Sequence, residues 1–447
     1  MNMIFRRIGL LISFLAATIM GSKVFAQAWS LEQCLRYAEE HNLNILQQKL
    51  QVESRESSLT TDKLAALPAV NLSADQQFSF GRATGLDNII VNRSQANTSF
   101  GASANLPIFT GLRMTNQVKA DKFNLQAALA DLEKSKEDLR LNVTAYYLQA
   151  LYAKAIVSIA EEQVALSEEQ VATTRKMVEN GKKAESELYD NLASLSADRQ
   201  QLTESRSQER LALLDLAQLL MIENVAAFDI APLDVNSEAL GQMALMQNPD
   251  SAYAHSLSVR PEIAAQQYRL ESSKANVRVA QSGWYPTLSF SAWYGTGYYH
   301  LYDGDNNPFG NQLKNNGSTA IGFSLNIPVF DRLATRNNVR QAKISAAAQE
   351  LELERSRQSL LKTIQTAYYN ALAAHDKLQS ARATQEASAV AYTYAQKRYD
   401  SGKASAYDLQ QAKTRLQKSQ VEATQALFEF VLRHQIFCFY AGEQSSL

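Results

Sequence analysis

Residue types that commonly carry out chemistry occur in this chain, but their spacing does not build a catalytic or metal site. The five histidines are scattered and form no HExxH pair, which places two zinc ligands on one helix face. No GxSxG, phosphate-loop or dinucleotide-binding glycine motif occurs. Met243 and Met246 are too few to indicate a copper or silver pathway. We therefore expect neither an enzyme nor a bound cofactor.

The composition excludes one further class and favours long secondary-structure elements. Lys and Arg number 44 against 45 Asp and Glu, so no basic field attracts nucleic acid. Only 17 glycines and 8 prolines occur in 447 residues, which indicates few turns.

The N-terminus resembles a secretory signal peptide. Arg6 and Arg7 precede an apolar run at 8–20, and small residues follow at Ala26 and Ala28. As a helix this run would rise only about 20 Å, which is short for a membrane anchor, the alternative reading. We predict a signal peptide at residues 1–26, cleaved after Ala26 or Ala28, and an exported mature chain.

In an exported chain, Cys34 and Cys438 could form a disulfide. Each also lies on an apolar helical face, so a pair of buried free thiols is the alternative.

The second half of the chain repeats motifs of the first half about 220 residues later. The motif NLPIF at 105–109 returns as NIPVF at 326–330, TAYY at 144–147 returns as TAYY at 366–369, and NGK at 180–182 returns as SGK at 401–403.

Each repeat is predicted to contain a helix, a β-hairpin and a long helical hairpin. The first repeat spans 27–258, with its β-hairpin at 68–110, helical hairpin at 111–221 and connector at 222–258. The second repeat spans 259–447, with its β-hairpin at 284–330, helical hairpin at 331–440 and a short tail.

The long helices carry apolar residues seven apart, which is typical of coiled-coil packing. Leu125, Leu132 and Leu139 show this step in the first repeat, and Leu353 and Leu360 show it in the second. A helix of about 65 residues, as each long stretch predicts, would form a rod of roughly 100 Å. A dimeric stalk would share this pattern.

The four predicted strands alternate apolar residues with small polar ones over about ten residues, as membrane-spanning strands do. In the last strand Ile321, Phe323 and Leu325 alternate with Gly322 and Ser324. Aromatic residues near the strand ends suggest an interfacial girdle: Phe78, Phe80, Trp284, Tyr285, Trp293 and Tyr294. A β-sandwich with its apolar face inward is the alternative.

Sheet edges cannot face lipid, because their backbone N–H and C=O groups would stay unpaired. Four strands cannot close a barrel alone, and three chains would supply twelve strands and leave a lumen. Two chains would supply eight strands, enough only for a barrel filled by side chains. An open lumen therefore favours a homotrimer, in contact with outer-membrane lipid.

Taken in order, these motifs resemble the TolC-like outer-membrane efflux family over essentially the whole mature chain. The resemblance rests on the duplication, on the Leu-Pro and Ile-Pro steps after the strands, and on RYDSG at 398–402 followed by YDL at 407–409. It implies a mostly α fold with a transmembrane β part: a periplasmic α-barrel continuous with a trimeric 12-stranded outer-membrane β-barrel. It also implies an exit duct that works with a periplasmic adaptor protein and an inner-membrane transporter.

The resemblance further implies a gated aperture at the periplasmic helix turns, which contain Gly181 and Gly402. Carboxylates six and nine residues after the second glycine line the family's aperture, and here these positions hold Asp408 and Gln411. Glu187 and Asp190 follow the first glycine at the same spacing, and Tyr399 matches a tyrosine of the closed state. The family's restraining arginine is replaced by Ala404, with Lys403 adjacent.

One alternative function shares several of these features. A periplasmic coiled-coil adaptor would also have an exported chain and long hairpins, but its β-domains would be compact and would not span a membrane. The sequence does not indicate the transported substrate or the identity of the pump.

Overall fold

A computed structural model describes residues 28–84, 89–233, 246–302 and 304–442. The predicted signal peptide and Met243 lie outside the described residues. The chain divides into two compact units, one formed by Met1–Leu46, Lys136–Ser256 and Lys362–Leu447, the other by Gln47–Ser135 and Leu257–Leu361. Each unit draws on both predicted repeats, because the longest helices pass from one unit into the other.

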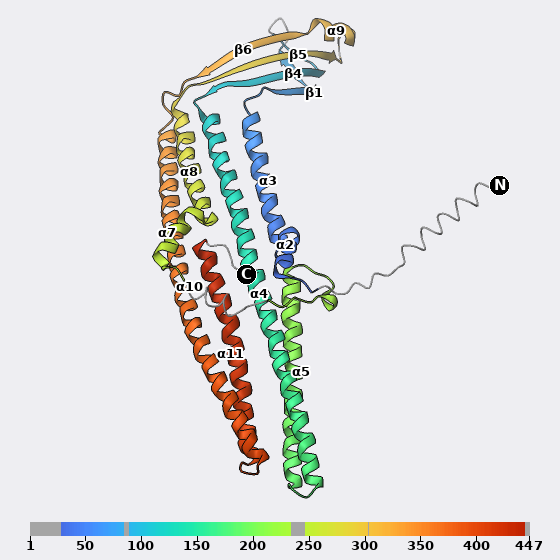
Figure 1. The fold of residues 1–447 in the computed structure, drawn as a ribbon. Coiled ribbons are helices and arrows are strands. Elements are labelled where there is room, and N and C mark those ends of the chain that lie inside the picture. The colour runs from blue at the N-terminus through green and yellow to red at the C-terminus, as the bar shows by residue number, and fades with distance from the viewer. Residues whose placement is uncertain (1–27, 85–88, 234–245, 303, 443–447) are drawn as a thin grey trace, which may run out of the picture. The chain divides into compact units, whose positions relative to one another are not determined.

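The second unit contains a four-stranded antiparallel sheet, whose strands lie side by side in Figure 1. Its strands are β1 (Ala69–Ser79), β4 (Gln95–Thr110), β5 (Thr287–Leu301) and β6 (Ser318–Asn326), in the order β1-β4-β5-β6. The pairing of β4 with β5 joins the hairpin of the first repeat to that of the second. This leaves one edge at β1 and the other at β6. Strands β2 (Arg82–Thr84) and β3 (Ile90–Asn92) form a separate small hairpin between β1 and β4.

One face of this sheet is apolar and exposed in the single chain, as the alternation predicts. Leu72 is 83% exposed and Phe323 is 70% exposed. Neighbouring strands pair in register, so their apolar residues gather on the same face. Burying large apolar side chains is favourable by about 1.5–3 kcal/mol each, so this face requires an apolar neighbour.

Strands β4 and β5 are longer than predicted because they pair with each other along their whole length, from Gln95 with Leu301 to Thr110 with Thr287. Helix α9 (Phe309–Asn315) supplies a partner on the other edge of β5. Strand β6 pairs with β5 only as far as Gly295. Beyond that point the side chain of Gln312 accepts a hydrogen bond from the Tyr299 N–H and donates one to the Tyr299 carbonyl, each at 3.0 Å. The amide therefore replaces a neighbouring strand.

Helices α3 (Leu43–Leu64), α8 (Pro261–Gln281) and the first parts of α4 (Arg113–Glu179) and α10 (Ala334–Asp400) complete this unit. The predicted seven-residue seam is largely buried, with Leu132, Leu353 and Leu360 at 8% exposure or less. Leu129 remains exposed.

The first unit contains α2 (Leu31–His41), α7 (Pro249–Val259) and the remaining parts of α4 and α10 with their return helices, α5 (Glu185–Leu219) and α11 (Ala406–Ala441). Ion pairs join α4 to α5 and α10 to α11, among them Arg199–Glu168 and Lys377–Glu429. The buried Tyr147 donates its hydroxyl to the Ala231 carbonyl at 2.7 Å.

One feature of this unit differs from the sequence-based expectation, and another decides between two alternatives that the sequence left open. Helix α7 lies inside the segment predicted as a plain connector; Pro249 begins it, and the Asn248 side chain caps it by accepting from the Asp250 N–H at 2.9 Å. Cys34 and Cys438 are buried free thiols, so the disulfide alternative is not realised. Burial raises the pKa of Cys34 to about 12, which keeps this thiol protonated and unreactive.

None of the helices in the described part of the chain is long and apolar enough to span a membrane.

Candidate gating site at the helix turns

Two glycines in the left-handed conformation end the long helices α4 and α10. Gly181 has φ of 68° and Gly402 has φ of 71°. After Gly181, the Lys182 N–H donates to the Met177 carbonyl at 2.8 Å, and after Gly402 the Lys403 N–H donates to the Arg398 carbonyl at the same distance. Both turns are therefore Schellman motifs, which explains the conformation that the glycines must supply.

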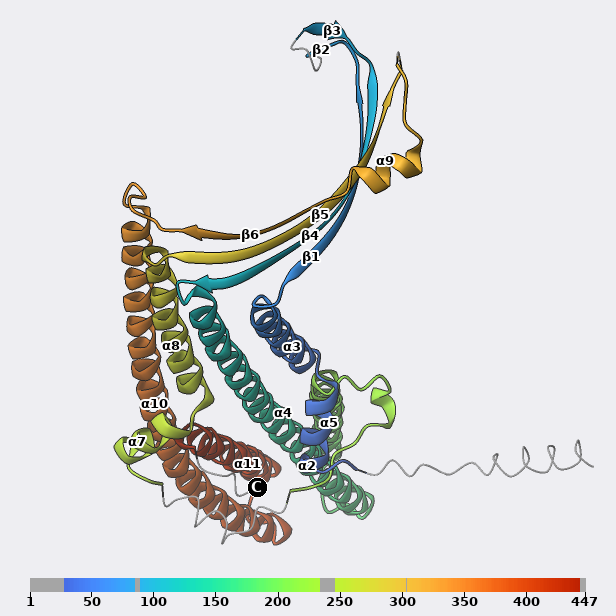
Figure 2. The ribbon, with the colours of Figure 1, turned by 90° about the horizontal axis from the view of Figure 1, so that it is seen from above.

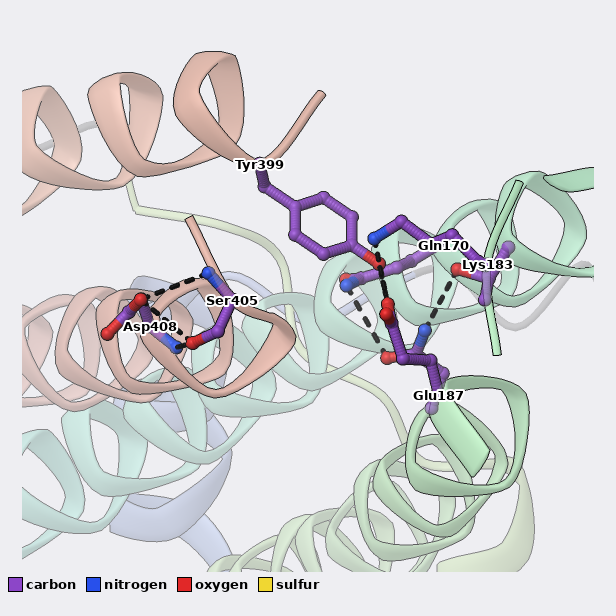
Figure 3. A network of polar contacts seen from close by, with 8 residues as sticks. Gln170, Lys183, Glu187, Tyr399, Ser405 and Asp408 are labelled. Atoms are coloured by element: carbon purple, nitrogen blue, oxygen red, sulfur yellow. Dashed lines mark hydrogen bonds and ion pairs between the residues drawn. The ribbon is translucent and has the colours of Figure 1, made fainter. Parts of the chain in front are cut away.

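A polar cluster links the two turns, and Figure 3 shows it from close by. The Tyr399 hydroxyl, at the end of α10, donates to the Glu187 carboxylate in the first turn of α5 at 3.1 Å. Lys183 binds the same carboxylate at 2.8 Å, and its ammonium lies 3.4 Å from the centre of the Tyr399 ring. Tyr399 is only 5% exposed, so this cluster is largely shielded from water.

Lys183 is the cation of this cluster. Partial burial acts to lower its pKa, but its contacts with Glu187 and Tyr399 outweigh burial and raise the pKa above the ordinary lysine value. Lys183 therefore stays charged at neutral pH and can hold both partners.

Asp408 was predicted to be a carboxylate that lines an aperture, and in the structure its side chain is instead held by its own helix. It forms a capping box with Ser405 at the start of α11: the Ser405 N–H donates to Asp408 at 3.0 Å, and the Asp408 N–H donates to the Ser405 hydroxyl at 3.2 Å. Figure 3 shows this pair apart from the Tyr399 cluster. These hydrogen bonds lower the pKa of Asp408.

Glu187 and Asp408 occupy equivalent places in the two repeats, six residues after Gly181 and Gly402 respectively. The residue that caps each helix explains why they differ. Ser405 supplies a hydroxyl for α11, whereas Ala184 gives α5 no side-chain cap. Glu187 therefore bonds to Tyr399 and Lys183, while Asp408 is held by its own helix.

The other predicted gating residues lie outside this cluster. Asp190 and Lys403 are exposed. Gln411 lines an open groove on α11 together with Tyr407 and Lys418. The structure thus brings together Tyr399 and Glu187 of the predicted set, and it adds Lys183, which sequence reasoning missed. The spacing of Lys183 and Glu187, four residues apart across a helix start, was the available signal.

A second polar cluster, also absent from the sequence-based expectation, ties α11 to the first hairpin. Lys413 of α11 is almost fully buried and binds Asp198 of α5 at 2.8 Å. Both residues also bond to the hydroxyl of Ser167 on α4. A buried lysine is costly unless it is paired, so this cluster fixes the contact between the three helices.

The chain was compared with known proteins. The family model described as "Outer membrane efflux protein" matches residues 34–220 and 252–428. The pyoverdine export outer membrane protein OpmQ of Pseudomonas putida is 25% identical over 431 residues, which cover 91% of this chain and 86% of the relative.

Solved channels have the same fold. The structure of CusC superposes with a TM-score of 0.77 at 17% identity, covering 93% of this chain and 92% of that one. The CmeC outer membrane channel of Campylobacter jejuni superposes with a TM-score of 0.73 at 18% identity, covering 93% and 87%. With the family match spanning both repeats, this chain belongs to the outer membrane efflux protein family.

Proposed function

We propose that the chain works as a homotrimeric exit duct of a tripartite export system, fed by an inner-membrane transporter through a periplasmic adaptor. The protein is an outer-membrane efflux channel whose helical part lies in the periplasm. The adaptor alternative finds no support in the family or the fold.

The observation that carries the proposal is the sheet, with its exposed apolar face and its two unpaired edges at β1 and β6. In lipid, the backbone groups of these edges must find partners. Pairing β6 of one protomer with β1 of the next satisfies them, and three copies close the ring with twelve strands. The polar face then encloses a lumen.

In the first unit, the cluster of Tyr399, Glu187 and Lys183 acts as the gate restraint. It holds the end of α10 to the start of α5, so the two helix turns separate only when the Tyr399–Glu187 hydrogen bond breaks. The chain contains no phosphate-loop motif, and the energy for opening therefore comes from a partner.

An open groove further along the helical hairpins supports adaptor binding. It has a volume of about 470 Å³ and is lined by residues of α4, α5 and α11, among them Ile156, Gln201 and Lys418. Helical hairpins of an adaptor would fit such a groove by packing an amphipathic face into it.

The assembly is tested by extracting the tagged protein from outer membranes and adding it to planar lipid bilayers. A heat-dissociable trimer that conducts ions is the expected result, and in-cell crosslinking from the groove should capture an adaptor. Recovery as a periplasmic monomer without conductance would refute the proposal.

The gate is tested by Tyr399→Phe, which removes the hydroxyl bonded to Glu187 and keeps the ring. Loss of a hydrogen bond to a charged group is worth about 1.5–3 kcal/mol, so open events in bilayers should rise roughly tenfold or more. The exposed Tyr407 provides the matched control, and Tyr407→Phe should leave opening unchanged. Equal opening of Tyr399→Phe and the wild type would exclude the restraint.

A further inference from the structure

Trp293 is a large aromatic residue on the polar face of the sheet, at a place where its paired neighbours are small; Tyr299, which pairs with Asn97, lies on the same face three rows further along β5. Trp293 pairs with Ser103 on one side and Ala320 on the other. Directly paired residues lie on the same face, so Trp293 belongs to the face of the serines, asparagines and glycines. The prediction that Trp293 joins an interfacial girdle is therefore wrong: β5 continues to Leu301, and Trp293 lies near its middle.

The contacts of α9 identify this face independently. Helix α9 packs against the opposite face of β5, where the Thr296 hydroxyl donates to the Leu313 carbonyl at 2.6 Å and Tyr298 contacts Phe309 edge to face. Figure 2 shows α9 on the outer side of the bend of the sheet. Trp293 therefore lies on the inner side of the bend, which faces the lumen once the barrel closes.

Two glycines leave a surface without side chains on which the indole ring of Trp293 lies. Gly101 and Gly295 are paired across β4 and β5 and follow the Trp293 row along the strands. A methyl group at Gly295 would overlap the ring, at 2.6 Å from Cη2, and one at Gly101 would meet Nε1 at 3.6 Å. The indole thus lies along the wall, with 45% of the residue still exposed.

The charge of the same face favours one class of ligand. Asp75 is exposed on β1 and pairs with Ser99, one row beyond the glycine row. It is the only acidic residue in strands β1, β4, β5 and β6, and these four strands contain no Lys or Arg. In a trimer, three carboxylates and three indole faces would line one stretch of the lumen. Cations are attracted to both groups.

We propose that Trp293 and Asp75 form a weak binding subsite in the barrel lumen for planar organic cations that pass through the duct. The indole supplies stacking and cation–π contact, and the carboxylate raises the local concentration of cations. The subsite rests on the proposed function, because only a closed barrel turns this face into a lumen.

The test measures block of single-channel current by ethidium, a planar aromatic cation, added at the outer mouth of trimers in planar bilayers. Trp293→Leu keeps apolar bulk but removes the π face, and should raise the half-blocking concentration about three- to thirtyfold. The half-blocking concentration for Trp293→Phe should lie between those of Trp293→Leu and the wild type. Asp75→Asn should weaken block by ethidium and leave block by a neutral aromatic solute unchanged.

Trp284, an exposed tryptophan in a short 3-10 helix before β5, provides the matched control. Channels with Trp284→Leu should have the same half-blocking concentration of ethidium as the wild type. Equal half-blocking concentrations for the wild type, Trp293→Leu and Trp293→Phe would overturn the subsite and leave the channel intact. A wild-type trimer that does not conduct would instead contradict the proposed function.

Discussion

At the scale of single residues, equivalent carboxylates in the two repeats have separate tasks. Asp408 is held in the capping box of α11, and Glu187 joins the two hairpins. A carboxylate at this position of the turn therefore need not be free to bind ions, because hydrogen bonding within its own helix start can hold it.

The capping role of Asp408 predicts a pH dependence at the start of α11. Its pKa is lowered in the folded protein, so its contribution to stability is present above the ordinary aspartate pKa of about 3.9 and is lost as the pH falls through the folded value. The protection of the first-turn amides of α11 against hydrogen exchange, expressed relative to the intrinsic exchange rate at each pH, should therefore fall in the wild type on acidification from about pH 5 to below pH 3.

In Asp408→Asn these amides should be less protected than in the wild type at pH 5, and their protection relative to the intrinsic exchange rate should change little on acidification. An unchanged acid response in this variant would assign the effect to other carboxyl groups.

The buried Lys413 predicts a large effect on stability. Lys413→Ala leaves Asp198 without its cation in a nearly dry site, which should cost about 3–5 kcal/mol, measured by urea unfolding in detergent. The double variant Lys413→Met with Asp198→Leu should regain most of this loss. The exposed Lys418 serves as control, since its pairing with Glu422 at 3.9 Å is worth little. A double variant as unstable as Lys413→Ala would contradict this account.

At the scale of elements, the glycines of the two helix turns are needed for their backbone conformation and not for lack of space. Around Gly402, a methyl group would meet no atom within 4 Å. Any loss of stability in Gly402→Ala therefore comes from the φ of 71°, since an L residue in the left-handed conformation costs roughly 1–2 kcal/mol of conformational free energy.

Hydrogen exchange of the Lys403 amide should detect this cost as faster opening of the turn. Gly402→Asn should cause a smaller loss of protection at the Lys403 amide, because asparagine tolerates the left-handed region. Equal protection in the wild type and Gly402→Ala would show that the turn changes conformation without loss.

At the scale of the whole molecule, periodic patterns predicted the elements well. Alternation identified the four strands, and the seven-residue step identified helices that bury Leu353 and Leu360. These signals are strong because burial selects every second or every seventh residue over a long stretch.

Isolated polar residues escaped this reasoning. Lys413 occupies a helix surface in the sequence, and only the packing of α4 and α5 against it makes that surface a core. Lys183 joins a partner more than 200 residues away, Tyr399, which no local pattern encodes. Trp293 was assigned to a strand end because the extension of β5 depends on its pairing with β4 and on the side chain of Gln312 in α9, which the alternation within β5 does not reveal.

The pairing of β4 with β5 has a consequence for how such a ring could have arisen. A half-length ancestor with one β-hairpin would need six identical copies to reach the same strand count. Fusing two halves makes every second junction covalent and halves the number of subunits that must meet. It also allows the halves to diverge, so that Glu187 after one turn bonds to Tyr399 while Asp408 after the other caps its own helix.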